Sequence, residues 1–350
     1  MARIVVAGIG AVGASVAYHL ALLGADDVVL ADRAAIAGRA TSKGMGGVRQ
    51  QFSTAAEVQL AQKSIEFFAS LGPECFLQVG YLFLATTEEG LAALEERRDV
   101  QRALGVPVER VDPSFVAGLR TDDLDGAVFC ATDGVGSPVA VTHELVRRAR
   151  ALGVEVLERQ PAEELERDLL VIACGAASAE LGAQIGVELP IRPLCRQLLE
   201  TTPLPDLPAA LPMTVEAETG FHFRRRGDRL VLAITDPEPR WTDEELVDET
   251  LIPDRLERLA YRYPPAAGAS VERAWAGLYD MTPDAHPIVG RVADGVYAAC
   301  GFSGHGFMQS PAVGRALAEE ILLGRSELDL SPYRLERFDE GAVFPEDVVL

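Results

Sequence analysis

The first thirty residues alternate between apolar runs and glycine-marked breaks. Four small hydrophobic residues, 4–7, run into Gly8, Gly10 and Gly13; a helical pattern follows, and a second apolar run ends at Asp32. Short apolar runs bounded by glycines favour buried strands, whereas a longer apolar segment at helical spacing favours a helix. The pattern predicts a βαβ unit at the start of the chain.

The later pattern predicts alternating helices and strands, interrupted by a different kind of sheet. Helical spacing covers residues 55–71, 88–104, 141–152 and 311–324, and strand-like runs lie within 75–86, 153–160 and 168–173 and from Val296. Three runs between residues 191 and 235 are joined by short turns, which is typical of antiparallel strands. The chain is therefore predicted to be an α/β protein with a Rossmann-type domain and an inserted mixed, largely antiparallel β-sheet domain.

The predicted domain boundaries follow these changes of pattern. Residues 1–74, 132–190 and 276–350 are assigned to the Rossmann-type domain, and residues 75–131 and 191–275 to the inserted domain. A length of 350 residues suits about two domains.

Residues 4–25 carry no charge and are long enough to resemble a membrane span or a signal sequence. Only Arg3 precedes the run, however, and four glycines and His19 interrupt it. A strand pattern also follows at once. We therefore expect no membrane insertion.

Composition excludes several classes of partner. The formal net charge of −21 argues against nucleic acid and anionic lipid, because phosphates would be repelled. The five cysteines are odd in number and scattered without a C-x-x-C pair, which favours reduced thiols in a cytoplasmic protein and no metal site.

The glycine turn of the βαβ unit has the dinucleotide fingerprint G-x-G-x-x-G, with Asp32 nineteen residues beyond Gly13. This fingerprint alone is compatible with NAD or FAD. A second glycine turn, residues 301–306, lies between a strand and a helix near the C-terminus. Its backbone amides suit an anion, and the negative edge of a reduced flavin supplies one, so the pair of turns favours FAD.

Several motifs together resemble a known family. They are "GIGAVGASVAYHLA", "TSKGMGGVRQQFS", "LLVIACGAAS", "AGLYDMTPDAHPIVG" and "CGFSGHGFMQSPAVG". They resemble the FAD-dependent amino acid and amine oxidoreductases of the D-amino acid oxidase superfamily, in particular the sarcosine oxidase, glycine oxidase and proline dehydrogenase branch. The resemblance implies oxidation of the C–N bond of a small amino acid or secondary amine. A hydride passes to flavin N5, and the resulting imine is hydrolysed.

The sequence departs from that family in two places. About ten residues, "PAEELERDLL", replace a longer β-meander on the adenine side of the site. Gly277 stands where some relatives attach flavin through a cysteine, and the N-terminal loop lacks the histidine that others use. The resemblance therefore implies non-covalent FAD.

The predicted cofactor contacts come from both glycine turns and from the segments between them. They are Gly8, Gly10, Ala11, Val12, Gly13, Asp32, Arg33, Thr41, Ser42, Lys43, Gly46, Gly47, Ala173, Gly175, Gly304, His305, Gly306, Phe307 and Met308.

The predicted catalytic and substrate-binding residues are Arg49, Tyr279, His222, Arg224 and Met308. Arg49 is the first choice for a substrate carboxylate, because a guanidinium fork matches a carboxylate; a structural ion pair is the alternative. Tyr279 is either a pocket residue or a core tyrosine, and His222 and Arg224 share one strand face. Met308 stands where sarcosine oxidases carry a lysine, which makes a double carboxylate clamp of that type doubtful.

Lysine scarcity bears on the electron acceptor. Some oxidases of this family place a lysine of the inserted domain near flavin N5, and that domain here has none. We therefore expect a dehydrogenase rather than an oxidase. Two alternatives remain open: an NAD-dependent dehydrogenase, and a flavin-binding subunit with little activity. Homo-oligomers or hetero-oligomeric complexes are both possible.

Overall fold

The computed structural model describes residues 2–345, and the chain starts with the predicted βαβ unit. Strand β1 (Ile4–Ala7) leads into helix α1 (Ala11–Leu22), and β2 (Val28–Asp32) returns parallel to β1. All four residues of β1 are buried. The run of small apolar residues therefore forms a central strand, as two-sided burial requires.

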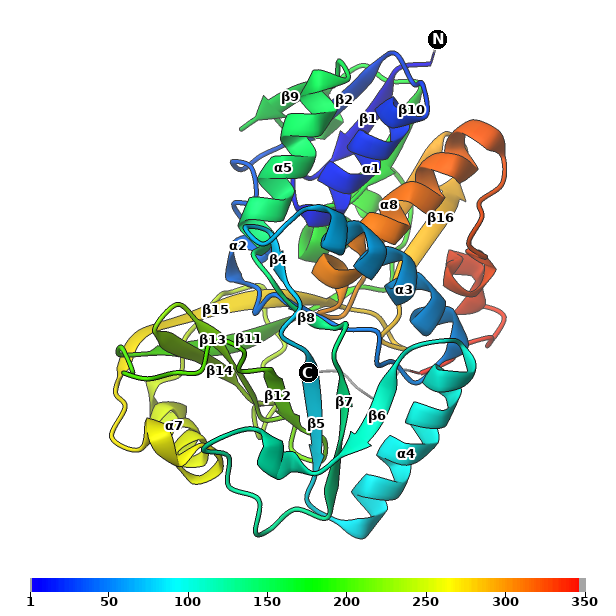
Figure 1. The fold of residues 1–350 in the computed structure, drawn as a ribbon. Coiled ribbons are helices and arrows are strands. Elements are labelled where there is room, and N and C mark those ends of the chain that lie inside the picture. The colour runs from blue at the N-terminus through cyan, green and yellow to red at the C-terminus, as the bar shows by residue number, and fades with distance from the viewer. Residues whose placement is uncertain (1, 346–350) are drawn as a thin grey trace.

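This unit lies in a six-stranded sheet (Figure 1, top). The order is β16-β17-β10-β1-β2-β9, and the pairing is parallel except for the β16–β17 hairpin. The added strands are β9 (Glu155–Glu158), β10 (Leu169–Ile172), β16 (Ile288–Ala293) and β17 (Val296–Cys300). Segments far apart in sequence thus form one Rossmann-type sheet.

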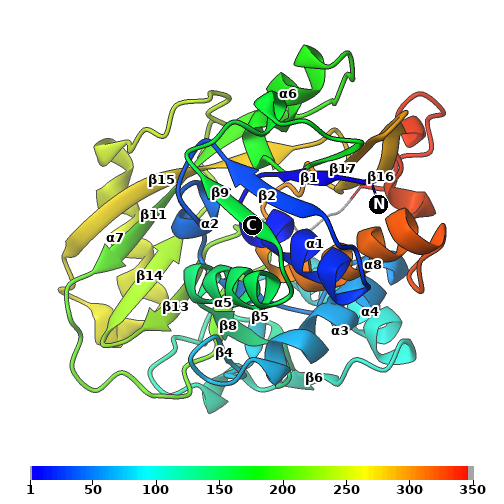
Figure 2. The same cartoon turned by 90° about the horizontal axis from the view of Figure 1, so that it is seen from above.

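Helices cover both faces of this sheet (Figure 2). Helices α1, α5 (Pro138–Ala151) and α8 (Gly306–Leu323) pack on one face, and α3 (Ala55–Ser70) packs against α8. On the other face, α6 (Ser178–Gln184) lies over apolar residues of the strands. The helices cover the faces of the sheet but not the carboxyl ends of its parallel strands. In sheets of this type, ligands bind in a crevice at these ends.

Helices α1 and α8 approach closely at a glycine. A Cβ on Gly314 would lie 2.2 Å from Ser15 Oγ and 2.7 Å from the Ser15 carbonyl carbon. Helix propensity alone would favour alanine at this position by about 1 kcal/mol. We expect the clash to outweigh it, so Gly314→Ala should lower the free energy of unfolding by about 1–3 kcal/mol in denaturant titrations.

The matched control for this helix is Gly324→Asn. Gly324 ends α8 in the left-handed conformation with open space around its Cα, and asparagine tolerates that conformation. Gly324→Asn should therefore change stability little. A Gly314→Ala variant as stable as the natural protein would contradict the packing argument.

The second domain is an eight-stranded sheet (Figure 1, bottom). Its order is β15-β11-β14-β13-β12-β5-β7-β6, antiparallel except for β12 and β5. The strands are β5 (Tyr81–Ala85), β6 (Val108–Val111), β7 (Gly126–Cys130), β11 (Arg192–Thr201), β12 (Met213–Glu216), β13 (His222–Arg226), β14 (Arg229–Ala233) and β15 (Val271–Met281). The predicted α/β fold with an inserted, largely antiparallel sheet is confirmed.

Helices α4 (Glu88–Ala103) and α7 (Ile252–Arg262) pack on this second sheet. A three-stranded sheet of β3 (Gly47–Val48), β8 (Gly134–Gly136) and β4 (Phe76–Leu77) lies between the two large sheets, next to the short helix α2 (Ala40–Lys43). The domain boundary predicted between residues 275 and 276 falls inside β15, which continues to Met281.

Two helices begin earlier than predicted. Helix α5 starts at Pro138 instead of residue 141, because the Ser137 side chain accepts a hydrogen bond from Ala140 N and caps it. Helix α8 starts at Gly306, with Pro311 inside it. Proline cannot donate to the carbonyl four residues earlier, and the Ser310 hydroxyl donates to that Phe307 carbonyl instead, at 2.9 Å. The helix therefore continues through the proline.

The apolar segment at the N-terminus is divided between a strand and a helix that ends at Leu22. Across residues 2–345, no helix combines the length and the hydropathy needed to cross a bilayer.

Candidate functional site

A cavity of about 850 Å³ lies between the two large sheets. Both predicted glycine turns line it, together with side chains from β11, β13 and β15 of the second sheet. Its volume is within the range of small-molecule and cofactor sites. The two ends of the chain therefore contribute to one site.

The first glycine turn makes one end of the cavity. Gly8 has φ +109°, and a Cβ there would lie 2.2 Å from the Ala173 carbonyl oxygen of the neighbouring strand. A Cβ on Gly13 would lie 1.9 Å from the Gly8 oxygen, so the third glycine lets α1 pack against the turn. The N-terminus of α1 faces the cavity through Gly10 and Ala11. Such a turn with a helix N-terminus binds phosphate groups.

Asp32 lies at the carboxyl end of β2, beside this turn. One carboxylate oxygen accepts from Ile9 N and the other from Ala34 N, both at 2.7 Å. Each oxygen keeps a further lone pair, which can accept a ribose hydroxyl. Next to it, Arg33 forms ion pairs with Glu163 and Glu180.

The second glycine turn forms another part of the cavity wall. Gly301 and Gly304 have φ +74° and +94°, and a Cβ on Gly304 would lie 2.4 Å from the ring of Tyr279. The Asp280 carboxylate accepts a hydrogen bond from Gly301 N at 2.7 Å, which fixes the turn to β15. Burial raises the pKa of Asp280 to about 6. Helix α8 begins directly after the turn, so its positive end faces the cavity.

Arg49 is held rigidly at the cavity wall. Its guanidinium carbon lies 4.1 Å from the ring centre of Phe52, and the side chain is 1% exposed. Nη1 donates to the Gln51 carbonyl, and Nη2 donates to His305 Nε2 at 3.4 Å. A fixed guanidinium of this kind is suited to bind a carboxylate.

Tyr279 and His222 face the same cavity from two strands of the second sheet. Burial raises the pKa of Tyr279, so its hydroxyl stays protonated. Burial, together with the positive charges of Arg196 and Arg49, lowers the pKa of His222 to about 4. His222 Nδ1 donates to the Gly220 carbonyl at 2.8 Å, which leaves Nε2 as an acceptor.

Most of the predicted residues line the cavity. They are Gly8, Gly10, Ala11, Val12, Asp32, Arg33, Thr41, Lys43, Gly46, Gly47, Ala173, Gly175, Gly304, His305, Gly306, Phe307 and Met308, and among the predicted substrate residues Arg49, Tyr279 and His222. Thr41 accepts a hydrogen bond from Ala11 N at 3.2 Å, which joins α2 to the start of α1.

Lys43, which was predicted to contact the cofactor, lines the cavity and also contacts the second domain. A Cβ on Gly277 would lie 3.0 Å from Lys43 Cβ, so the lysine packs against β15. Its amine contacts the carboxylate of Glu245. Burial lowers the pKa of this amine. Lys43 thus brings a lysine to the cavity from the first domain, although the second domain contains none.

Three predicted residues do not line the cavity. Gly13 acts in packing, and the Ser42 hydroxyl donates to the Arg39 carbonyl at the surface. Arg224 lies two residues beyond His222 on β13 and sits behind the loop, with Nη2 3.3 Å from the position of a Cβ on Gly46. Burial lowers the pKa of Arg224 to about 9.

Arg196, which lines the cavity from β11, was not predicted from the sequence. The available signal was a charged residue between Cys195 and Gln197, within a run predicted to form an antiparallel strand. Tyr81 of β5 also lines the cavity and was missed.

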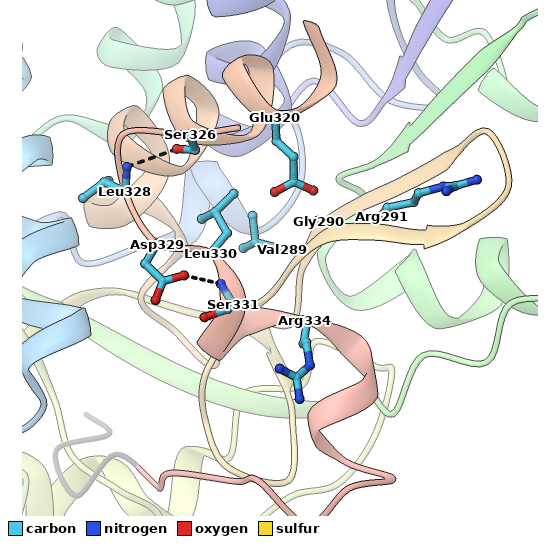
Figure 3. Close-up of a pocket in the computed structure, with 10 residues that line it drawn as sticks. All are labelled: Val289, Gly290, Arg291, Glu320, Ser326, Leu328, Asp329, Leu330, Ser331 and Arg334. Carbon is cyan, nitrogen blue, oxygen red and sulfur yellow. Dashed lines mark hydrogen bonds between the residues drawn. The ribbon is translucent and has the colours of Figure 1, made fainter. Parts of the chain in front are cut away.

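A second pocket, of about 380 Å³, lies between β16, the end of α8 and the segment that follows (Figure 3). Ser326 Oγ and Asp329 Oδ1 accept hydrogen bonds from the backbone of residues 328 and 331, at 3.2 and 2.9 Å. These polar groups stabilise local turns. Burial raises the pKa of Glu320 in this pocket. Among residues 2–345, no group of three or more potential ligands is arranged for a metal ion.

Comparison with known proteins agrees with this geometry. A sequence model for FAD dependent oxidoreductases matches residues 3–320. FAD-dependent oxidoreductase domain-containing protein 1 of Bos taurus is 30% identical and covers 99% of this chain and 87% of its own. Glycine oxidase of Geobacillus kaustophilus is 26% identical over 95% of this chain and 96% of its own.

A solved structure extends this similarity to three dimensions. L-proline dehydrogenase from P. horikoshii is 26% identical, with a TM-score of 0.90 over 97% of this chain and 98% of that chain. The match of 318 residues to the family model, from 3 to 320, spans both domains and the cavity between them. The chain therefore belongs to the DAO family of FAD-dependent oxidoreductases.

Proposed function

We propose that the protein oxidises the C–N bond of a small amino acid or secondary amine of the sarcosine, glycine or proline class. The observation that carries the proposal is the shared cavity, in which two glycine turns meet Arg49, Tyr279 and His222. Glycine oxidase and L-proline dehydrogenase, two similar proteins, are named for substrates of this size.

The residues at the glycine turns suit FAD. At Gly10 a side chain would occupy space next to Thr41 at the start of α1, where a diphosphate has to approach the backbone. Asp32 is placed to accept ribose hydroxyls, and the α8 N-terminus is placed to stabilise negative charge on a reduced flavin ring. When bound, FAD would accept the substrate hydrogen together with its bonding electron pair, and water would hydrolyse the imine product.

The chain's own residues would bind and orient the substrate. Arg49 would hold the carboxylate, and the neutral Nε2 of His222 and the hydroxyl of Tyr279 would contact polar groups of the substrate. Burial, together with the positive charges of Arg196 and Arg49, lowers the pKa of His222, and the same environment favours the neutral form of a substrate amine. That form is needed because its lone pair drives the oxidation.

Steady-state assays test the proposed reaction. With phenazine or a quinone as acceptor, sarcosine, glycine and proline are compared with hydroxy acids of the same size. The proposal predicts turnover of the amines with formation of a carbonyl product, and no turnover of the hydroxy acids. Turnover of hydroxy acids alone would exclude it.

We further propose that FAD is bound non-covalently. Gly277 offers no side chain to the flavin, and Cys174, which lines the cavity, lies beside Ala7 at the nucleotide end. Acid precipitation should therefore leave all of the flavin in the supernatant. A yellow precipitate would show covalent attachment.

A dehydrogenase is proposed over an oxidase. Oxygen reduction creates negative charge that a nearby ammonium can stabilise, and here the amine of Lys43 is paired with Glu245. In stopped-flow experiments, substrate-reduced protein should be reoxidised faster by a quinone than by air-saturated buffer. Faster reoxidation by oxygen would make the protein an oxidase.

The remaining alternative is a flavin-binding subunit with little activity of its own. It predicts bound FAD with no amine-dependent turnover in the isolated chain. Recovery of turnover on adding a partner subunit would favour this alternative.

A further inference from the structure

Arg196 lies in the middle of β11, and it is one of the residues that line the cavity. In the antiparallel pair of β11 and β15 it stands opposite Gly277. Its guanidinium carbon lies 5.8 Å from the ring centre of Tyr279, which is within the range of a cation–π contact. Arg196 is therefore in the substrate half of the cavity, beside a predicted catalytic residue.

The guanidinium of Arg196 is incompletely satisfied. Its Nε and Nη1 atoms are buried, and neither donates a hydrogen bond to any residue between positions 2 and 345. A buried donor without an acceptor is costly, and more so when it carries charge. An anion that enters the cavity beside this guanidinium would offset part of this cost, because it stabilises the positive charge.

Five of the six acidic residues that line the cavity have partners other than Arg196. Asp32 binds two backbone amides at the nucleotide end, where Glu163 and Glu180 pair with Arg33. Glu245 contacts Lys43, and Asp243 is exposed. Asp280 follows Tyr279 in β15, so it points to the opposite face of the strand, where it accepts from Gly301 N.

The guanidinium groups of Arg49 and Arg196 both lie near the part of the cavity that His222 and Tyr279 line. His222 lies close enough to both Arg196 and Arg49 for each to disfavour its protonated form, and the same two arginines act on Tyr279. One carboxylate can be held by Arg49. The fork of Arg196 is then left for a second anionic group.

We propose that Arg196 binds a second carboxylate of the substrate, so that the preferred substrates are amino dicarboxylates: amino acids or secondary amines with two carboxylate groups. This inference rests on the proposed C–N oxidation. A site built around a buried hydrogen-bonding group rejects analogues that lack the matching group more strongly than an apolar pocket does. Arg196 would thus be a specificity residue, and Arg49 would bind the carboxylate that all substrates share.

Dead-end ligands test this inference without turnover. The FAD-loaded protein is titrated with glutarate and succinate and with the monocarboxylates butyrate and propionate, and the change in the visible flavin spectrum gives each Kd. Glutarate should bind about 10- to 150-fold more tightly than butyrate, and succinate than propionate, because each monocarboxylate lacks only the second carboxylate of its partner. In Arg196→Met this preference should disappear, while the Kd of butyrate stays within about twofold.

Two control variants accompany the titration. Arg196→Lys keeps the charge and should retain part of the preference. Arg229→Met removes a positive charge from β14 that is paired with Glu272 at the surface, and it should leave every Kd unchanged.

Three results would overturn the inference. The natural protein could bind dicarboxylates and monocarboxylates equally. Arg196→Met could weaken butyrate as much as glutarate, which would assign Arg196 to the shared carboxylate. Finally, Arg196→Met could shift the spectrum and the reduction potential of the ligand-free flavin without changing the preference for dicarboxylates. That result would assign Arg196 to flavin binding.

Failure of the proposed reaction would appear differently. If no amine reduces the flavin but glutarate still binds preferentially, the C–N chemistry is wrong and the dicarboxylate site stands. If sarcosine and proline reduce the flavin faster than glutamate and N-methylaspartate, the reaction stands and the dicarboxylate preference is wrong.

Discussion

Replacing Gly8 with alanine should give a protein that retains little or no FAD. The new Cβ would lie 2.2 Å from the Ala173 oxygen and 2.8 Å from its carbonyl carbon. These atoms cannot move aside easily, because Ala173 N is hydrogen-bonded to Ala7 O and β10 is paired with β1. The turn that faces the diphosphate would therefore be displaced.

A matched substitution separates this clash from backbone strain. Gly24 has φ +97°, close to the +109° of Gly8, but no atom lies within 4 Å of its Cβ position. Gly24→Ala should cost only the strain of a left-handed alanine, about 1–2 kcal/mol, and should keep its FAD. Flavin absorbance per mole of protein and thermal unfolding measure both effects.

A third variant keeps the fold and tests the cofactor alone. Gly10 has an ordinary φ of −85°, and its Cβ would meet only Thr41 Oγ1, at 3.1 Å. Gly10→Ala should therefore fold normally and bind FAD weakly. Wild-type FAD content in both Gly8→Ala and Gly10→Ala would contradict the assignment of this turn to the cofactor.

Replacing Arg49 with methionine should lower kcat/KM for amino acids by about 30- to 5,000-fold. The guanidinium is 1% exposed, so a carboxylate bound to it would be largely removed from water. Removing one partner of such a pair leaves the other charge buried without compensation. Arg49→Lys should recover only part of the activity, because an ammonium lacks the planar fork.

Substrates that lack a carboxylate serve as the control for the Arg49→Met variant. Amines that lack a carboxylate should be oxidised equally by the natural protein and by Arg49→Met, since they do not use the guanidinium. Flavin content and melting temperature show whether loss of the Gln51 and Phe52 contacts has disturbed the fold. An equal loss of activity toward carboxylated and uncarboxylated amines would assign Arg49 a structural role.

The sequence was sufficient for much of the fold, because its strongest signals are local. Gly8, Gly10 and Gly13 act through close backbone contacts, which a motif records directly. The choice between NAD and FAD needed the second glycine turn, and membership in a family of FAD-dependent oxidoreductases now decides it. The sequence pattern placed the start of α8 at Pro311 instead of Gly306, because proline usually marks the first turn of a helix.

The substrate half of the cavity was harder to predict. Strand β11 is largely buried on both faces, so alternation of apolar and polar residues does not show which side chains face a ligand, and Arg196 was missed. Arg224 shares a strand face with His222, but two residues along a strand move a side chain by about 6.6 Å, past the edge of the cavity. Such placements depend on contacts between distant segments.

Anaerobic titration of the purified protein, followed by its visible spectrum, tests the central claim most directly. The account predicts a yellow protein with bound FAD whose visible absorbance bleaches when an amino acid or secondary amine is added, and returns when an electron acceptor follows. A protein that binds no flavin, or a bound flavin that stays oxidised with every amine and amino dicarboxylate, would contradict it.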